Sequence, residues 1–303
     1  MAIYVQSCGV SQDNDYRWLK IRQNTHIPEI PAILKRPFPG AAGTTVRVTN
    51  MIDSKTPSII LARWDGELLL LVTGLKAKEE RADFQGRPVR NSVAWIYPDS
   101  DNNERVIRSL AVRALKGELQ SEIDEAVNVG GEYGFEVSFE KINQLAQPEK
   151  IESLEAESPI RIGENSPEFK ELLALELERH CLLKEDPNRL LVVVTGIKAK
   201  DTLLQARVWR GLSAHVTTQR WIERPDETLD FNPVTTRARQ NPSKENVFFL
   251  GIAIAVVMVI LLIILVVKLL IPLKLEPETS PSPSQVLPQT NLPTQEMLQQ
   301  LES

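Results

Sequence analysis

The alternation of apolar and polar residues is clearest in the first third of the chain, where it predicts three neighbouring strands. Residues 58–64 and 67–75 are apolar runs, and Asp65-Gly66 lies between them. Asp-Gly between two such runs predicts a type I′ hairpin, because both residues tolerate the positive φ that this turn requires. The uninterrupted apolar run 68–72 is typical of a strand covered on both faces. Residues 89–97 predict a further strand that ends at Pro98.

Helical spacing follows in two segments. Residues 102–119 carry apolar side chains at positions 106, 107, 110, 111, 114 and 115, the spacing of an amphipathic helix. Ser166-Pro167 predicts the start of a second helix that runs to about residue 184, with serine as N-cap and proline in the first turn. Residues 133–139 alternate as a half-buried strand does, and 190–197 predict another buried strand.

Two connecting segments interrupt this pattern. Residues 24–56 contain four closely spaced prolines and form a long connection for a compact domain, so we expect either a functional loop or an ordered wrap over the core. Residues 145–166 are acidic and bounded by prolines, which predicts a linker or an exposed excursion.

The longest apolar run is Val247 to Val267, which has no charged residue and a single glycine, Gly251. A helix of that length is roughly 31 Å long, close to the ~30 Å hydrocarbon core of a bilayer. A run that is apolar on every side does not match the surface helix of a globular domain. The sequence therefore predicts one transmembrane helix over residues 247–271. A fully buried core helix is the alternative.

An internal repeat links two of the predicted strands. LLVTGLKAK at 70–78 and VVVTGIKAK at 192–200 match almost residue for residue, and Gln85, Arg87 and Arg90 then align with Gln205, Arg207 and Arg210. Such a repeat predicts a duplicated strand-loop-strand unit in a pseudo-symmetric sheet.

Together these elements predict an α+β fold for the large amino-terminal part of the chain. We expect one soluble α+β domain over residues 1–225 with two related halves, about 1–145 and 160–225. A juxtamembrane linker follows at 226–246. After the span, residues 272–303 are rich in proline, serine, threonine and glutamine, which predicts a disordered tail.

Composition narrows the class of protein. The net charge is −5, so the chain lacks the basic footprint of a nucleic-acid-binding protein. Its two cysteines, Cys8 and Cys181, are far apart and show no metal-binding spacing, which favours the reducing side of a membrane. We expect no cofactor and no metal.

The ends of the span set the expected topology. The first fifteen residues have no basic n-region and no long apolar stretch, so we expect no secretory signal and a cytoplasmic amino-terminal domain. Arg237, Arg239 and Lys244 precede the span, whereas Lys268 and Lys274 follow it. The positive-inside rule therefore gives slight support to a cytoplasmic domain with the tail on the opposite side.

The loop around residues 83–91 concentrates the chemistry of the soluble part. Asp83, Arg87, Arg90 and Asn91 surround a glycine-containing turn. Paired arginine forks could hold a phosphate or a carboxylate through bidentate contacts. The alternative is a turn in which Arg87 and Asp83 pair with each other. The second repeat copy keeps its arginines but lacks the aspartate, the glycine and the asparagine.

Other candidate motifs favour structural roles. The Thr-Gly-x-Lys turns at 73–76 and 195–198 follow strands but lack the spacing of a phosphate-binding loop, so we expect glycine turns that close the strands. The three histidines, His26, His180 and His215, are widely separated. No catalytic triad order and no HExxH motif is present, which leans against an enzyme without excluding one.

We therefore expect a single-pass membrane protein whose cytoplasmic domain acts as a scaffold or regulator and binds a protein partner at the bilayer. The alternative is a membrane-tethered enzyme or a nucleotide or phosphate sensor that uses the 83–91 loop. The layout is similar to that of anti-sigma regulators, although their histidine-cysteine zinc pattern is missing here, and a shared layout does not establish a function.

The apolar run predicts the fraction in which the chain is found. After lysis without detergent and high-speed centrifugation, we expect the full chain in the membrane pellet and its release by detergent. A variant that lacks residues 247–271 should stay in the supernatant, because the predicted anchor is gone. A full-length chain found in the supernatant would contradict the span.

Overall fold

The computed structural model describes residues 1–224 except 23–24, 54, 78–80 and 148–150. The predicted linker 226–246, the predicted span 247–271 with Gly251 and Val267, and the predicted tail 272–303 lie outside the described residues. No helix in the described part of the chain is long and apolar enough to cross a membrane.

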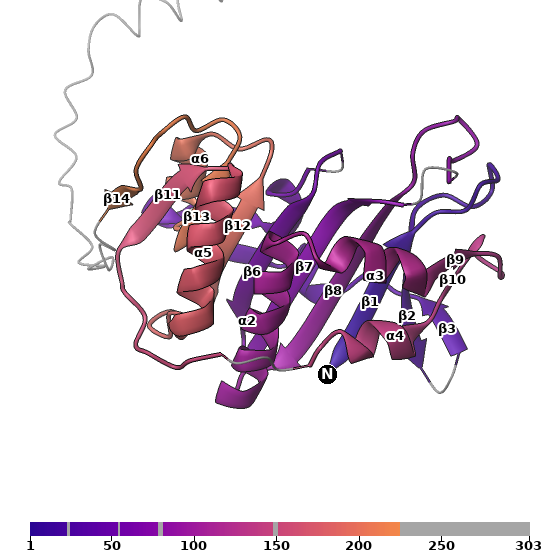
Figure 1. The fold of residues 1–303 in the computed structure, drawn as a ribbon, viewed down its shortest axis with the longest axis horizontal. Coiled ribbons are helices and arrows are strands. Elements are labelled where there is room, and N and C mark those ends of the chain that lie inside the picture. Colours follow the sequence, from indigo (N-terminus) through magenta and orange to yellow (C-terminus); the bar gives the residue numbers. More distant parts are fainter. Residues whose placement is uncertain (23–24, 54, 78–80, 148–150, 225–303) are drawn as a thin grey trace, which may run out of the picture. The chain divides into compact units, whose positions relative to one another are not determined.

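A mixed sheet and its covering helices make up the described residues, so the α+β fold is confirmed (Figure 1). Ten of the described strands form one sheet in the order β14-β11-β13-β12-β6-β7-β8-β1-β2-β3. The strands of this sheet are β1 (Ala2–Ser7), β2 (Arg17–Arg22), β3 (Thr25–Pro28), β6 (Ser58–Trp64), β7 (Glu67–Lys76), β8 (Arg90–Pro98), β11 (Ile160–Glu164), β12 (Arg189–Thr195), β13 (Arg210–Ser213) and β14 (Ile222–Arg224).

Two small hairpins and six described helices complete the fold. The hairpin strands are β4 (Pro37–Pro39) with β5 (Thr45–Arg47), and β9 (Val127–Val129) with β10 (Phe135–Val137). The helices are α1 (Ala32–Lys35), α2 (Asp101–Leu115), α3 (Leu119–Ala126), α4 (Phe139–Gln144), α5 (Pro167–Arg179) and α6 (Lys200–Gln205), with 3-10 turns at Ala41–Gly43 and Val48–Asn50.

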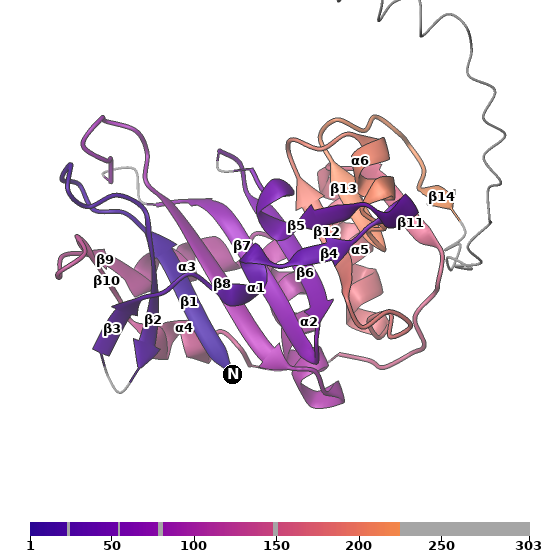
Figure 2. The same ribbon diagram turned by 180° about the vertical axis from the view of Figure 1, so that it is seen from behind.

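The two faces of the sheet carry separate apolar cores. Helices α2, α3, α4 and α5 cover one face, where Trp95, Leu110 and Leu173 are among the fully buried side chains (Figure 1). The segment from α1 to Met51 crosses the other face together with α6, and it buries Phe38 and Met51 there (Figure 2). Residues 32–51 of the proline-rich connection are therefore an ordered wrap over a core, whereas Thr25–Pro28 forms β3 of the sheet.

Local signals placed several elements correctly. In the turn between β6 and β7, Asp65 and Gly66 have φ of 48° and 78°, as a type I′ turn requires. The Ser166 hydroxyl accepts a hydrogen bond from the Phe169 backbone N–H at 3.3 Å and caps α5, with Pro167 in the first turn. Helix α5 ends at Arg179, five residues before the predicted end.

Only the first strands of the two repeat copies, β7 and β12, occupy equivalent positions in the sheet. Strands β7 and β12 flank β6, and both are antiparallel to it. Leu71 and its repeat partner Val193 both pair with Ile60. The prediction of a second strand-loop-strand unit is wrong, because residues 200–205 form α6 in place of a loop. This helix carries the chain over to β13, which is parallel to β12 and therefore needs a crossover.

The prediction of a linker or exposed excursion over 145–166 is wrong for its second half. Residues Ile160–Glu164 form β11, which lies in the sheet between β13 and β14. This strand pairs in parallel with β13 along Arg161↔Arg210 and Ile162↔Gly211. Both predicted halves of the domain thus contribute strands to one sheet.

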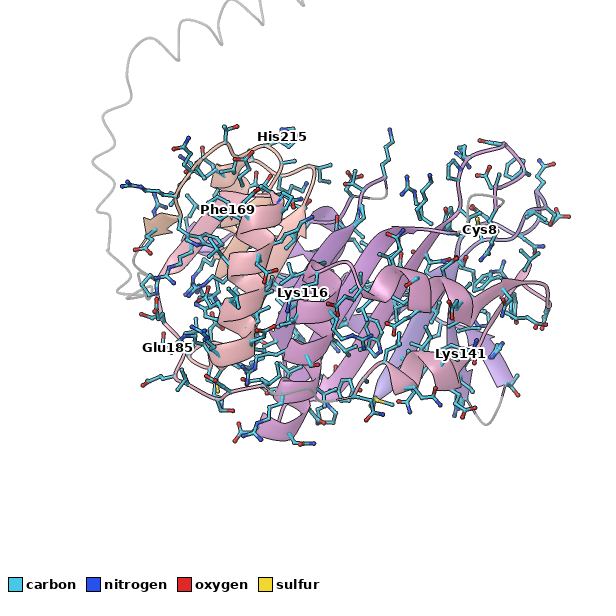
Figure 3. The ribbon with its side chains drawn as sticks, viewed as in Figure 1. Cys8, Lys116, Lys141, Phe169, Glu185 and His215 are labelled. Carbon is cyan, nitrogen blue, oxygen red and sulfur yellow. The ribbon has the colours of Figure 1, made fainter. Side chains whose placement is uncertain are left out.

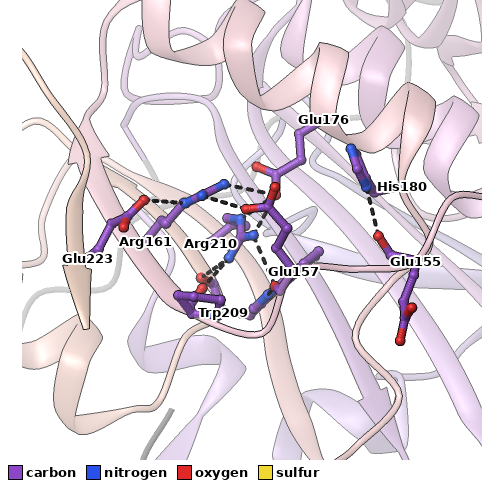
Figure 4. A network of polar contacts seen from close by, with 9 residues as sticks. Glu155, Glu157, Arg161, Glu176, His180, Trp209, Arg210 and Glu223 are labelled. Atoms are coloured by element: carbon purple, nitrogen blue, oxygen red, sulfur yellow. Dashed lines mark hydrogen bonds and ion pairs between the residues drawn. The ribbon is translucent and has the colours of Figure 1, made fainter. Parts of the chain in front are cut away.

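Buried arginines hold this excursion in place. Arg210 is fully buried, lies over the Trp209 ring, and donates to the carbonyl oxygens of Pro159 at 2.6 Å and Glu157 at 3.2 Å (Figure 4). It also pairs with the Glu176 carboxylate of α5. A buried guanidinium is stabilised only when its donors find acceptors, so these contacts fix the approach to β11.

Arg108 of α2 plays the same role for the end of α5. Its Nη1 donates to the carbonyl oxygens of Leu177 at 2.9 Å and His180 at 2.6 Å, and Nη2 donates to Glu152 at 2.8 Å. The side chain is fully buried. Its charge complements the negative end of the α5 dipole and satisfies carbonyls that the helix leaves unpaired.

We predict that Arg108→Ala lowers the free energy of unfolding by about 3–5 kcal/mol, because three backbone carbonyls lose a buried donor and Glu104 loses an ion pair. Urea or thermal unfolding of the purified chain measures the change. The matched control is Arg105→Ala one turn away on the exposed side of α2, which should change stability by less than about 0.5 kcal/mol. Equal effects of the two substitutions would contradict the role of Arg108.

Candidate functional site

A row of polar side chains crosses the sheet at one end of the strands. The polar row consists of Gln6, Ser92, Thr73, Ser58, Thr195 and Ser213, one residue from each of the six adjacent strands β1, β8, β7, β6, β12 and β13. Two residues further along each of β1, β8, β7, β6 and β12, the same face carries apolar side chains of the core beneath the proline-rich wrap. The row therefore marks where that core ends.

Half of the polar row is covered by loops. The Ser58 hydroxyl accepts from the Asp53 backbone N–H at 3.1 Å, and the Thr195 hydroxyl accepts from that of Ile197 at 3.3 Å. The Ser213 hydroxyl accepts from the His215 N–H at 3.0 Å. These three hydroxyls thus anchor the turns that lie over them.

The other half forms the floor of a pocket of about 460 Å³. Thr73 and Ser92 bond to each other at 2.7 Å, and Gln6 lines the same pocket beside them. Gly74 follows Thr73 with a φ of 75°, and a Cβ there would lie 2.3 Å from the Thr56 carbonyl oxygen. Gly74 lies inside β7, where the register with β8 shifts between Val72 and Leu75, so the predicted strand-closing turn is wrong for this copy. Only glycine fits this irregularity, which explains the Thr-Gly pair without a phosphate loop.

The 83–91 loop forms one wall of the pocket, with Asp83, Arg87 and Arg90 among the lining residues. Asp83 and Arg87 pair, with Oδ2 at 2.7 Å from both Nε and Nη2. The Asp83 Oδ1 accepts the backbone N–H groups of Gln85 and Arg87 at 2.9 Å. The structure thus contains the paired turn that the sequence left as an alternative, and the same residues border a pocket.

Asn91 lies apart from these three residues. It follows Arg90 in β8, so its side chain points to the opposite face of the sheet, where it is buried and accepts a hydrogen bond from the Ser7 hydroxyl at 2.8 Å. Its neighbours there include Arg81, which donates to the Ser7 hydroxyl and to the carbonyl oxygen of Cys8. Figure 3 labels Cys8. The structure therefore brings together three of the four residues singled out in the sequence.

Tyr16 and Lys55 complete the pocket, and neither stood out in the sequence. The Tyr16 hydroxyl accepts the Arg90 backbone N–H at 2.8 Å, which joins the 8–16 loop to the start of β8. Burial raises the pKa of Tyr16, so the phenol stays protonated at neutral pH. The signal that could have revealed the site was the change from apolar to hydroxyl side chains at the ends of β7 and β8.

Arg90 and Lys55 give the pocket its positive charge. The Arg90 Nη1 donates to the Gly74 carbonyl at 3.2 Å, and the remaining guanidinium donors have no partner among the described residues. Lys55 is exposed at the rim and forms no ion pair within the described part of the chain. Asp83 already pairs with Arg87. Burial would raise the pKa of Asp53, but hydrogen bonds from Thr56 and Lys55 and the charges of Lys55 and Arg90 lower it. Arg90 and Lys55 can therefore hold an anionic group beside Asp53, with which neither forms an ion pair among the described residues.

In the second repeat copy, the corresponding arginines pair with acids of the same chain. Arg207 pairs with Asp186 at 3.3 Å, and Arg210 is buried against Glu176. Across the described residues, no group of three or more His, Cys, Asp or Glu side chains is placed to hold a metal ion. The arrangement at the 83–91 loop is suited to binding an anion through an arginine, a lysine and hydroxyl groups.

We predict that Asp83→Ala opens the 83–87 turn. Burial by itself would raise the pKa of Asp83, but hydrogen bonds from Arg87 and Gln85 outweigh it and lower the pKa. The carboxylate therefore holds the turn at neutral pH, and this contribution is lost as the pH falls through the lowered value, below the usual ~3.9 of aspartate. Hydrogen exchange measured by mass spectrometry should speed up at Gln85 and Arg87.

Arg87→Gln is the control for this variant, because it leaves the two backbone bonds to Asp83 Oδ1 in place. Exchange in the turn should then stay close to that of the parent chain. Unchanged exchange in Asp83→Ala would mean that the turn is held by something other than this carboxylate.

Comparisons of the chain with protein-family models, with curated proteins and with solved structures give no match. The function proposed below therefore stands on the chemistry of the chain's own residues, since a fold does not by itself fix an activity.

Proposed function

We propose that this protein is a single-pass, membrane-anchored scaffold or regulator whose α+β domain binds a cytoplasmic protein partner at the 83–91 loop. The observation that carries the proposal is the convergence of Asp83, Arg87 and Arg90 on one open pocket. The apolar run 247–267 supports the tether, and the basic residues Arg237, Arg239 and Lys244 before it support a cytoplasmic domain with the tail on the other side of the membrane.

Binding suits this site because its side chains are already held in position. Asp83 fixes the turn, Tyr16 fixes the start of β8, and Gly74 fixes the carbonyl that orients Arg90. A prearranged set of donors lowers the entropy that a partner loses on association.

A membrane-tethered enzyme or a nucleotide or phosphate sensor is the second candidate. It is favoured by the charges of Arg90 and Lys55 in a pocket large enough for a small molecule. A rise in melting temperature with ATP or inorganic phosphate would support the sensor.

We predict that a photo-crosslinking amino acid at position 85 captures a specific protein in intact cells, because Gln85 is exposed on the loop beside the pocket. Position 205 is the matched control, since Gln205 is the repeat counterpart of Gln85 and is also exposed. The crosslinked species should be found in the membrane fraction and identified by mass spectrometry. Equal capture at both positions, or capture at neither, would refute a binding role for this loop.

A further inference from the structure

The pocket at the 83–91 loop continues into a second pocket on the same face of the sheet. Gln6 and Tyr16 line both, and the second pocket has a volume of about 540 Å³. Together the two pockets form one groove. Its first end lies over β7 and β8, and its second end is bordered by Trp18 of β2, Pro28 of β3 and the following residues up to Lys35.

The length of this groove follows from the sheet. It crosses β7, β8, β1, β2 and β3, which are consecutive neighbours. Four inter-strand spacings of about 4.8 Å give a length of roughly 19 Å. An extended peptide advances about 3.3 Å per residue, so about six residues match the groove.

The charge of the groove is opposite to that of the chain as a whole. Apart from Arg17, its lining contains four cationic and two acidic side chains, a surplus of two positive charges, whereas the chain carries a net charge of −5. The cations are Lys35, Lys55, Arg87 and Arg90, and the acids are Asp83 and Glu29. The Arg17 guanidinium lies over the Tyr133 ring on the opposite face of the sheet. Such a surplus attracts an acidic partner and speeds its association.

Both acids of the groove are already paired within the protein. Asp83 pairs with Arg87, and Glu29 pairs with Lys20 at 3.2 Å while it accepts the Tyr4 hydroxyl at 2.7 Å. An incoming carboxylate would therefore meet Arg90 and Lys55 without displacing either acid, with Asp53 as a neighbouring carboxylate beside both cations. The far end is more apolar, because Leu34, Trp18 and the half-exposed Ile30 line it.

From these observations we propose that the groove binds an extended acidic segment of a protein partner, about six residues long. A carboxylate of this segment lies against Arg90 and Lys55, and an apolar side chain three or four residues away lies against Ile30 and Leu34. This inference rests on the proposed function and adds the chemistry of the partner. A peptide matches both the length of the groove and the contrast between its two ends.

Fluorescence anisotropy with the full-length chain in detergent tests the proposal. The probes are two pools of capped, fluorescein-labelled hexapeptides. One has Asp or Glu at position 2 and Leu, Ile or Phe at position 5, and the other has Lys at position 2. We expect the acidic pool to bind at least tenfold more tightly and to weaken as salt is added, because exposed charges are screened.

Variants separate the two ends of the groove. Arg90→Gln should weaken binding of the acidic pool about tenfold through loss of the arginine–carboxylate pair, and Ile30→Ser about threefold. Lys55→Gln removes an exposed charge and provides a second test if Arg90→Gln does not fold. Arg47→Gln, an exposed substitution outside the groove, should leave binding unchanged.

Three results would overturn the inference. The first is equal binding of the two pools, and the second is full binding by both Arg90→Gln and Lys55→Gln. The third is a melting-temperature rise with ATP or inorganic phosphate, lost in Arg90→Gln, while the acidic pool does not bind. If crosslinking at position 85 still captures a protein in that case, the proposed partner binding is kept, and only the proposal that the partner segment is acidic is rejected.

Discussion

A buried guanidinium group must find acceptors, and this requirement shapes the helical face of the sheet. Arg108 and Arg210 are both fully buried, and their donors are bonded mainly to backbone carbonyls of the chain between residues 152 and 180. Hydrophobic packing alone is not directional, whereas these bonds fix where the acidic excursion runs. The hydrogen bonds from Arg210 to the carbonyl oxygens of Glu157 and Pro159 position β11 beside β13.

On the opposite face of the sheet, the apolar core ends at the polar row, and the loops and the groove lie beyond it. Along the polar row, three hydroxyls accept hydrogen bonds from loop backbone, whereas Thr73 and Ser92 bond to each other and line the groove with Gln6. The same residue types thus serve a structural purpose on β6, β12 and β13 and line a groove on β7, β8 and β1. The difference lies in what covers each strand end.

The different surroundings of the strand ends explain why the two repeat copies place their equivalent arginines differently. The strands β7 and β12 keep the same register on β6, but the segments that follow them have different lengths and different neighbours. After β7 the chain forms a charged loop that leaves Arg90 partly accessible. After β12 it forms a helix, and the corresponding Arg210 is buried against Glu176.

Features that depend only on neighbouring residues can be read from the amino-acid sequence. Asp65-Gly66 specifies its turn because the required φ values are a local property, and Ser166 caps α5 because its hydroxyl reaches the next N–H groups. The pairing of Asp83 with Arg87 is equally local. The apolar run 247–267 is likewise a property of composition.

Contacts between segments that are distant in sequence depend on long-range packing and cannot be read from local patterns. The segment 160–164 is short and lacks a strong strand pattern. Its place in the sheet therefore depends on pairing with β13 and on the hydrogen bonds from Arg210. Whether Arg90 or Asn91 faces the groove depends on the register of β8, in which one residue reverses the face. Tyr16 and Lys55 reach the site from separate loops, because long-range pairing of the strands brings those loops together.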